Sequence, residues 1–275
     1  MSARGSVGVV IPTYERVDET VRAVQSVLGQ TVAPAQVVVA DDGSSPPTVE
    51  ALAERLAGGP AELVRAPRSG HPGRVRNEGL TRLDTEWVAF LDSDDTWHAE
   101  KLERQLAAAE GGAVAVCTNA RRIVSGRPVG TVLDSLPPQL GLGDLIRENK
   151  VINSSVLIRR DVLDDVGRVA SSYLVRGCED YATWLRVASR HRWTALPEPL
   201  VDYVDEPSVS IRGSEEFAVH PGQVAAWIDF VMWRRETGAA LRLPEQVLTA
   251  VLRRALLAST RREGRLPATG PGRGT

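Results

Sequence analysis

Strand-like and helix-like segments alternate through the first third of the chain, and this alternation restricts the folds open to it. Runs of apolar or β-branched residues are predicted to form buried strands at residues 5–12, 36–40, 61–65 and 86–91. Apolar residues at helical spacing predict helices at residues 15–30, 48–57 and 73–83. The pattern indicates right-handed βαβ units and an α/β fold with a mainly parallel sheet flanked by helices.

The rest of the chain is less regular. We expect helices at residues 101–109 and 181–190, a hairpin at 121–132, and strands at 113–118, 151–159 and 200–204. Two further helical stretches, 217–236 and 244–262, are predicted to form a C-terminal helical extension. The last residues, rich in Gly, Pro and Arg, have the composition of a disordered tail.

Composition excludes several classes of protein. The net charge of −2 and the pI of about 6.1 give no general reason to expect nucleic-acid binding. No apolar run approaches the roughly 18–20 residues of a membrane span, and no secretory signal is expected. Two cysteines without metal-type spacing favour a reduced, cytoplasmic protein.

Polar residues follow three of the predicted strands, where ligands of parallel sheets bind. The densest group is Asp92, Asp94 and Asp95. Three carboxylates within four residues repel one another unless a positive charge lies among them, and oxygen ligands suit Mg²⁺ or Mn²⁺. The alternative is the ordinary preference of acidic residues for loops and helix starts.

Two other groups bear on nucleotide binding. Asp41 and Asp42 end the second strand, where a carboxylate can accept hydrogen bonds from a base or ribose; the alternative is a turn in which Gly43 takes a positive φ. Arg74 and Arg76 lie on the helix after the third strand. Their forked guanidinium groups suit a pyrophosphate, or they simply form a solvated helix face.

Glu179 and Asp180 precede an apolar helix. A carboxylate in this place is either a helix cap or a general base facing the acidic cluster.

The predicted C-terminal helices also admit two interpretations. An apolar stripe with arginines at its end (Leu248, Val251, Leu252, Ala255; Arg253, Arg254, Arg261, Arg262) fits either packing on the core or contact with an anionic membrane or a second subunit. A second apolar set (Val224, Trp227, Ile228, Val231, Met232) predicts a buried or dimer-forming face.

Taken together, these motifs resemble the family-2 glycosyltransferases of the GT-A fold over roughly residues 5–210. The matching segments, in order, are VVIPTYER at 9–16, DDGS at 41–44, RNxG at 76–79, FLDSDD at 90–95, TWHAEKL at 96–102 and EDYATWLR at 179–186. The resemblance implies a metal-dependent, inverting transferase that uses a nucleotide-sugar donor, most often UDP-linked. Its order of motifs implies a donor half (1–95), an acceptor and catalytic half (96–213), C-terminal helices (214–262) and a tail (263–275).

The resemblance also implies roles for individual residues. On the donor side these are the edge of the nucleotide pocket (Pro12, Thr13, Tyr14), base recognition (Asp42, with Asp41 beside it), phosphate contact (Arg76) and contact with the ribose, donor sugar or Mn²⁺/Mg²⁺ ion (Asp94, Asp95). On the acceptor side they are the catalytic base (Asp180), an acceptor contact (Glu179) and pocket walls (Trp97, Trp184), although large aromatic residues in such positions are as often core.

The sequence departs from the family pattern after the last core strand. Many relatives have a metal-ligating His there, whereas residues 203–210 contain none, so Asp205, Glu206 or water would take its place. The acceptor stays open among saccharide, lipid-linked, small-molecule and peptide nucleophiles, and a lipid-linked one would bring the protein to the inner face of the membrane. A non-catalytic sugar-nucleotide-binding protein is the alternative function. A nucleotidyltransferase would need a Gly-rich phosphate loop that residues 9–16 lack.

Overall fold

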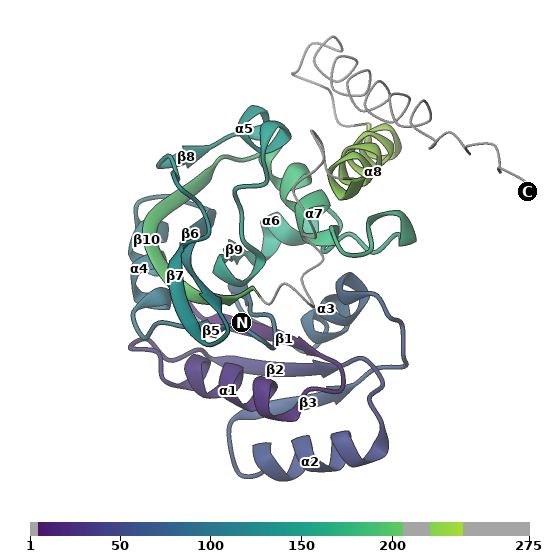
Figure 1. The fold of residues 1–275 in the computed structure, drawn as a ribbon. Coiled ribbons are helices and arrows are strands. Elements are labelled where there is room, and N and C mark those ends of the chain that lie inside the picture. Colours follow the sequence, from purple (N-terminus) through teal and green to yellow (C-terminus); the bar gives the residue numbers. More distant parts are fainter. Residues whose placement is uncertain (1–4, 206–220, 239–275) are drawn as a thin grey trace, which may run out of the picture.

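The amino-terminal half has the predicted alternation of strands and helices. A computed structural model describes residues 5–205 and 221–238 (Figure 1). The elements in order are β1 (Val7–Thr13), α1 (Val17–Leu28), β2 (Gln36–Asp41), α2 (Pro46–Leu56), β3 (Ala61–Arg65), α3 (Pro72–Leu80) and β4 (Trp87–Phe90). The four strands pair in parallel in the order β3-β2-β1-β4, so their carboxyl ends lie along one edge.

The second half extends the same sheet. Its elements are β5 (Thr96–Trp97), α4 (Lys101–Glu110), β6 (Ala115–Val124), β7 (Arg127–Thr131), β8 (Gln139–Leu140), α5 (Leu142–Arg147), β9 (Leu157–Arg159), α6 (Arg160–Asp165), α7 (Glu179–Ala188), β10 (Trp193–Val204) and α8 (Pro221–Thr237). The described sheet has ten strands in the order β3-β2-β1-β4-β9-β6-β10-β5, with β7 on β6 and β8 on β10. β9 runs antiparallel to both β4 and β6, whereas β6 and β10 are parallel. The α/β class with helices flanking the sheet is thus confirmed.

Helices cover both faces of this sheet, as the strand pattern requires. Val9 and Ile11 of β1 pack in one apolar cluster with α1 and α4, and Val10 packs in the other with α3, α6 and α7. Gly79 of α3 makes the second packing possible, since a Cβ there would lie 2.5 Å from Val10 Cγ1. This close approach brings the start of α3 to the carboxyl edge of the sheet.

Several predicted elements differ in extent. The strand predicted for 151–159 begins only at Leu157, because Asn153–Ser155 form a 3₁₀ turn. The final strand is longer than predicted and begins at Trp193. The predicted hairpin is present, with positive φ at Ser125 and Gly126 between β6 and β7.

α8 lies against α7 and corresponds to the predicted helix at 217–236. Trp227 is buried, whereas Met232 is 53% exposed, so this apolar set is buried only in part, and the alternative of a dimer-forming face stays a prediction. Residues 206–220, the predicted helix at 244–262 and the tail lie outside the described residues. None of the described helices has the length and apolar character needed to cross a bilayer.

Candidate active site

The predicted site residues gather at the carboxyl edge formed by β1, β2 and β4. Thr13 ends β1 and its carbonyl accepts a hydrogen bond from the Asp42 amide at 2.9 Å. The acidic motif at 92–95 follows β4 directly. Three segments that are distant in sequence are therefore adjacent at one edge, as the parallel topology predicts.

Asp41 has the turn-forming role that was the alternative interpretation. Its carboxylate is fully buried and accepts hydrogen bonds from the Ser44 amide, at 3.0 Å, and from the Ser44 hydroxyl. Gly43 has φ +70°, and a Cβ there would lie 2.7 Å from the backbone nitrogen of Arg68. Asp41 therefore shapes the loop that presents Asp42.

Asp42 is held by the loop that follows β3. Its carboxylate accepts hydrogen bonds from the Ser69 amide and hydroxyl, both at 2.8 Å, and from the Gly70 amide at 2.9 Å, and it pairs with Arg68. The Arg68 guanidinium carbon lies 3.5 Å from the centroid of the Tyr14 ring. A base approaching Asp42 would therefore meet Arg68 and Tyr14 as well.

The other two residues predicted at this pocket edge are less available than Tyr14. Thr13 is buried, and its hydroxyl is 2.7 Å from that of Thr20 in α1. Pro12 is half-buried within β1. Tyr14 is 42% exposed and presents its ring at the surface.

The carboxylates of the acidic motif occupy different environments. Asp94 is half-exposed and pairs with Arg16 at 2.6 Å. Asp95 is buried, and its two oxygens accept hydrogen bonds from the Ser154 hydroxyl at 2.6 Å and the Val204 amide at 2.9 Å. Burial and the charges of neighbouring carboxylates raise the pKa of Asp94 and raise that of Asp95 well above its usual range.

Burial and mutual repulsion raise the pKa values of both carboxylates, and a divalent cation bound here would relieve the repulsion. Their oxygen donors suit Mg²⁺ or Mn²⁺, ions that commonly take one or two carboxylates with water and phosphate oxygens. Among residues 5–205 and 221–238, no three His, Cys, Asp or Glu side chains form a metal-binding group. Asp205 pairs with Arg122 at 2.7 Å, and Glu206 lies outside the described residues.

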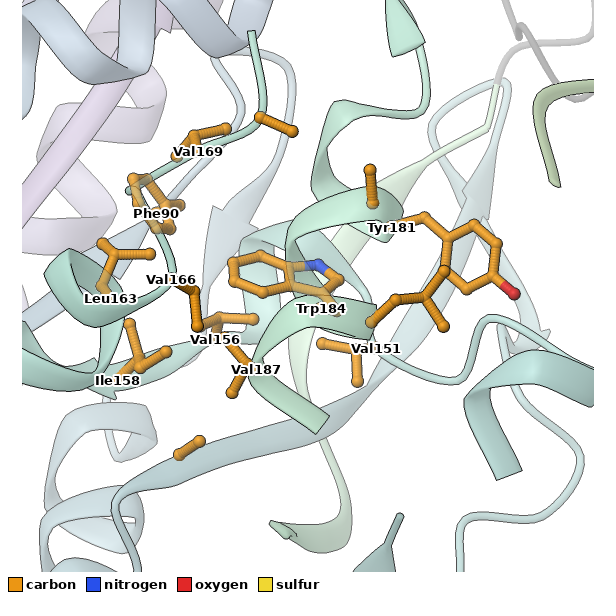
Figure 2. Packing of buried hydrophobic residues seen from close by; sticks show 14 of the residues in the cluster. Phe90, Val151, Val156, Ile158, Leu163, Val166, Val169, Tyr181, Trp184 and Val187 are labelled. Atoms are coloured by element: carbon orange, nitrogen blue, oxygen red, sulfur yellow. The ribbon is translucent and has the colours of Figure 1, made fainter. Parts of the chain in front are cut away.

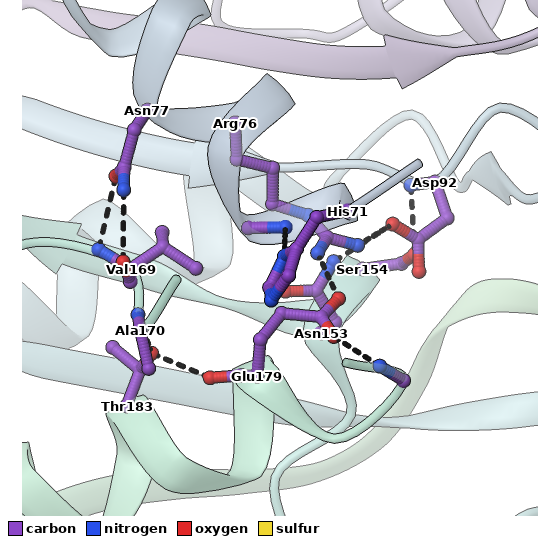
Figure 3. A network of polar contacts seen from close by, with 12 residues as sticks. His71, Arg76, Asn77, Asp92, Asn153, Ser154, Val169, Ala170, Glu179 and Thr183 are labelled. Atoms are coloured by element: carbon purple, nitrogen blue, oxygen red, sulfur yellow. Dashed lines mark hydrogen bonds and ion pairs between the residues drawn. The ribbon is translucent and has the colours of Figure 1, made fainter. Parts of the chain in front are cut away.

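Arg76 links the acidic motif to α7. Its two terminal nitrogens donate to Asp92 Oδ1 at 2.5 Å and to Glu179 Oε1 at 2.7 Å, as Figure 3 shows. Glu179 is buried, and its second oxygen accepts a hydrogen bond from the Gly177 amide at 2.7 Å. Both Glu179 oxygens therefore accept a hydrogen bond within the protein, and the contact of Glu179 with the acceptor stays a prediction.

Asp180 lies in the first turn of α7, beside this ion-pair chain. Burial and the adjacent Glu179 charge raise the pKa of Asp180 to about 6, and Arg76 acts in the opposite direction. A carboxylate with a pKa near neutrality is suited to take a proton and release it again. The geometry thus supplies a candidate base close to the acidic motif.

The two tryptophans expected at the acceptor pocket are core residues. Trp184 is 1% exposed, and its ring packs against those of Phe90 and Trp193. Figure 2 shows its indole inside the cluster of buried hydrophobic residues. Trp97 is buried, and its Nε1 donates to the Ser154 carbonyl at 2.7 Å. The expectation that they wall the pocket was wrong for Trp184, because Trp184 lies inside the apolar core, and Trp97 supports the turn beneath the acidic motif.

Four residues contact the predicted set without having been singled out. Arg16 lies within the first motif, so its position there was a usable signal. Arg68 had no signal beyond its place in a loop at the sheet edge. Asn153 and Ser154 donate to Asp92 and Asp95 from about 60 residues away, a contact that no local pattern reveals.

Several known proteins are similar to this chain in sequence. Among curated relatives, the succinoglycan biosynthesis protein ExoO of Rhizobium meliloti (strain 1021) is 31% identical over 150 residues, which cover 53% of this chain and 43% of ExoO. WfaP of Escherichia coli, named UDP-Glc:alpha-D-GlcNAc-diphosphoundecaprenol beta-1,3-glucosyltransferase, is 25% identical over 184 residues, covering 67% of this chain and 70% of WfaP. Two uncharacterised Rickettsia glycosyltransferases are matched over 30% of their lengths, so the chain spans less than half of ExoO and of these two relatives.

A solved structure shows the same fold. S. aureus TarS 1–349 in complex with UDP-GlcNAc superimposes with a TM-score of 0.66 at 20% identity, covering 90% of this chain and 70% of that one. The sheet order and flanking helices are therefore those of the GT-A architecture. The family model described as glycosyl transferase family 2 matches residues 8–167, which is more than half of the sequence. This chain belongs to glycosyl transferase family 2.

Proposed function

We propose that this glycosyltransferase is an inverting, metal-dependent enzyme that takes its sugar from a UDP-linked donor, with Asp180 as the general base. The observation that carries the proposal is the Asp180 carboxylate, whose pKa is raised to about 6. It lies beside Glu179, which Arg76 connects to Asp92 of the acidic motif. WfaP is named for a UDP-Glc donor, and TarS was solved in complex with UDP and with UDP-GlcNAc, which supports a UDP-linked donor here.

On the donor side, we propose that Asp42, Arg68 and Tyr14 receive the base. Asp42 would accept from the N3–H of uracil in place of its bond from Arg68, and the released Arg68 guanidinium would donate to a uracil carbonyl while remaining stacked on Tyr14. Asp94 and Asp95 would hold the divalent cation, Asp94 being the more accessible. When bound, that cation would offset the negative charge of the diphosphate.

The proposed reaction is a single displacement. Asp180 removes the proton from the acceptor nucleophile as that atom bonds to the anomeric carbon. The bond from that carbon to the diphosphate oxygen breaks on the opposite face, which inverts the anomeric configuration. One base suffices, because no covalent glycosyl intermediate has to be formed. On this proposal, residues 1–95 serve the donor and residues 96–213 the acceptor.

Calorimetry tests the donor site. Mn²⁺ is expected to tighten UDP binding by about 10- to 100-fold, and Asp94→Asn should abolish this gain because it removes one charge from the cation site. Asp84→Asn is the matched control, since Asp84 is exposed at the opposite edge of the sheet. Equal Mn²⁺ gains in the wild type and the Asp94 variant would remove Asp94 from the metal site, and a folded protein that binds no UDP would contradict the donor assignment.

We further propose that the acceptor is lipid-linked, as the name of WfaP describes for that relative. Residues at the start of α3 and in the segment 173–176 support this. Arg74 stacks on Tyr173 at 4.4 Å, Arg176 lies beside Gly70, and Tyr173 and Leu174 are 65% and 47% exposed. Within the described residues, no carboxylate pairs with Arg74 or Arg176. Exposed aromatic and aliphatic groups beside unpaired arginines suit the surface of an anionic membrane.

Vesicle sedimentation tests this surface. The protein should bind vesicles containing phosphatidylglycerol, and Arg176→Glu should weaken that binding several-fold, at about 1 kcal/mol for each basic residue near the surface. Arg127→Glu, on the exposed β7 hairpin, changes the net charge by the same amount and is the control. It should bind the vesicles about as well as the wild type does. Equal losses in both variants would show that only net charge matters and would contradict a membrane-facing surface at these residues.

A further inference from the structure

Arg76 is a buried cation between two elements that are far apart in the sequence. It is 5% exposed, and it bonds Asp92 after β4 and Glu179 at the start of α7, 103 residues away. The charges of both carboxylates, opposed by burial, raise its own pKa, so it stays protonated. Each of its two terminal nitrogens donates to a carboxylate of the protein, and its Nε–H has no hydrogen-bond partner among the described residues. Burial of the side chain, rather than these two bonds alone, leaves little of the guanidinium open to a phosphate.

The backbone around Arg76 is fixed from both sides. Asn77 donates to the Val169 carbonyl at 2.8 Å and accepts from the Val169 amide at 3.1 Å (Figure 3). A Cβ on Gly73 would lie 2.2 Å from the Ala170 carbonyl oxygen and 3.1 Å from Glu179 Cγ. The start of α3 is therefore packed directly on the segment that leads into α7, and Arg76 has a defined position relative to that helix.

Several charged groups surround Asp180. Glu179 on its own helix and Asp92 after β4 raise its pKa, and Arg76 of α3 lowers it. The Cys178 thiol is neutral, because burial and these carboxylates raise its pKa to about 12. On α8, Asp229 is paired with Arg186 at 2.5 Å. Arg76 is the cation among these groups that acts directly on Asp180.

We propose that Arg76 is a positioning residue for the catalytic base: it fixes the start of α7 against Asp92 and offsets the charge of Glu179, and it does not contact the donor phosphates. The proposal rests on the proposed function, because it requires Asp180 to be the base. It replaces the phosphate-binding role that the family resemblance implies for Arg76.

Titration of the Asp180 carboxyl by ¹³C NMR tests the electrostatic part without an acceptor. The signal is identified by its absence in Asp180→Asn. Arg76→Met should raise the midpoint from about 6 by roughly one pH unit, because an opposite charge within hydrogen-bonding distance of its neighbour is lost. Arg76→Lys should restore most of the shift, and Arg82→Met, on the exposed surface after α3, should leave the midpoint unchanged.

Glu179→Gln provides a second test of the electrostatic part in case the Arg76→Met protein does not fold. It keeps the side-chain size and an oxygen that can accept from Arg76, but it removes the negative charge beside Asp180. The Asp180 midpoint should therefore fall below that of the wild type. A midpoint that moves in neither variant overturns the electrostatic part of the proposal.

Kinetics and calorimetry test the positional part. With UDP-glucose or UDP-N-acetylglucosamine, UDP release by Arg76→Met should fall about 10-fold or more below pH 7, with UDP affinity within twofold of the wild type. A tenfold loss of UDP affinity with an unmoved Asp180 midpoint would overturn the proposal in favour of phosphate binding. Failure of the base assignment is seen separately, because Asp180→Asn would then retain transfer.

Discussion

Replacing Asp180 by asparagine is expected to slow sugar transfer by about 10²- to 10⁴-fold, the usual contribution of a general base. Asparagine has nearly the same size but cannot take a proton from the acceptor. Donor binding should persist, because Asp42, Arg68 and the acidic motif lie on other elements. The measurement is the steady-state rate of UDP release together with UDP affinity by calorimetry. Asp84→Asn serves again as the exposed control.

The pH dependence of kcat/KM in the wild-type enzyme should also report the ionisation of Asp180. Since the pKa of Asp180 is about 6, kcat/KM should rise with pH through this value and level off above it, because only the ionised carboxylate accepts a proton. Full activity in Asp180→Asn with an unchanged profile would contradict the base assignment. Donor binding without transfer in the wild type, across UDP-sugars and lipid-linked acceptors, would instead favour the alternative of a non-catalytic sugar-nucleotide-binding protein.

The raised pKa of Asp180 also makes the free energy of unfolding depend on pH. This free energy should fall as pH rises, whereas kcat/KM should increase. The pKa of Asp180 is raised in the folded state, so the folded protein keeps the proton over a pH range in which the unfolded chain has lost it. The free energy of unfolding of the wild type, relative to Asp180→Asn, should therefore fall as pH rises from about 4 to about 6 and then stay level.

Replacing Trp184 by alanine is expected to lower the free energy of unfolding by about 3–5 kcal/mol, the usual cost of removing a large buried aromatic side chain. The ring centroids of Phe90 in β4 and Trp193 in β10 lie 6.2 Å and 5.2 Å from that of Trp184. The cavity would open between α7 and the sheet. Urea unfolding measures the change.

Tyr173→Ala is the aromatic control for this experiment, since its ring is largely exposed and its loss should change stability by less than about 0.5 kcal/mol. Trp184→Phe should recover much of the lost stability. A Trp184→Ala protein that unfolds at the wild-type urea concentration but has a higher KM for the acceptor would restore the pocket-wall interpretation.

The fold of the proposed donor half was predictable because its sequence signals are local. Each strand from β1 to β4 is a short apolar run, and parallel topology requires the segments that follow β1, β2 and β4 to meet at one edge. The motif spacing then identifies the carboxylates in that edge. Helices α5 and α6 were missed, since six residues are too few to show helical periodicity.

The proposed acceptor half and the polar contacts were less predictable, because they depend on residues that are far apart in the sequence. The residues next to Arg76 in the sequence do not predict that Glu179 is its partner. A phosphate contact was therefore expected for an arginine at this position. Trp184 follows Asp180 on the same helix by four residues, and only the packing shows that the two face different environments. Sequence identifies the chemical groups here, but tertiary contacts decide which of them are free to react.

The docking of α8 has a consequence for how this protein can be divided. The family match ends at residue 167, but α7, which contains Asp180, lies after that residue. α7 is held in place by contacts with α8, which comes later in the sequence. Asp229 on α8 pairs with Arg186 of α7, and the Trp227 indole donates to the Tyr181 hydroxyl at 3.0 Å. A fragment that stops before α8 would keep the donor half but lose this anchorage. If Asp180 is the base, as proposed, the catalytic unit therefore extends beyond residues 8–167, the segment that matches the family model.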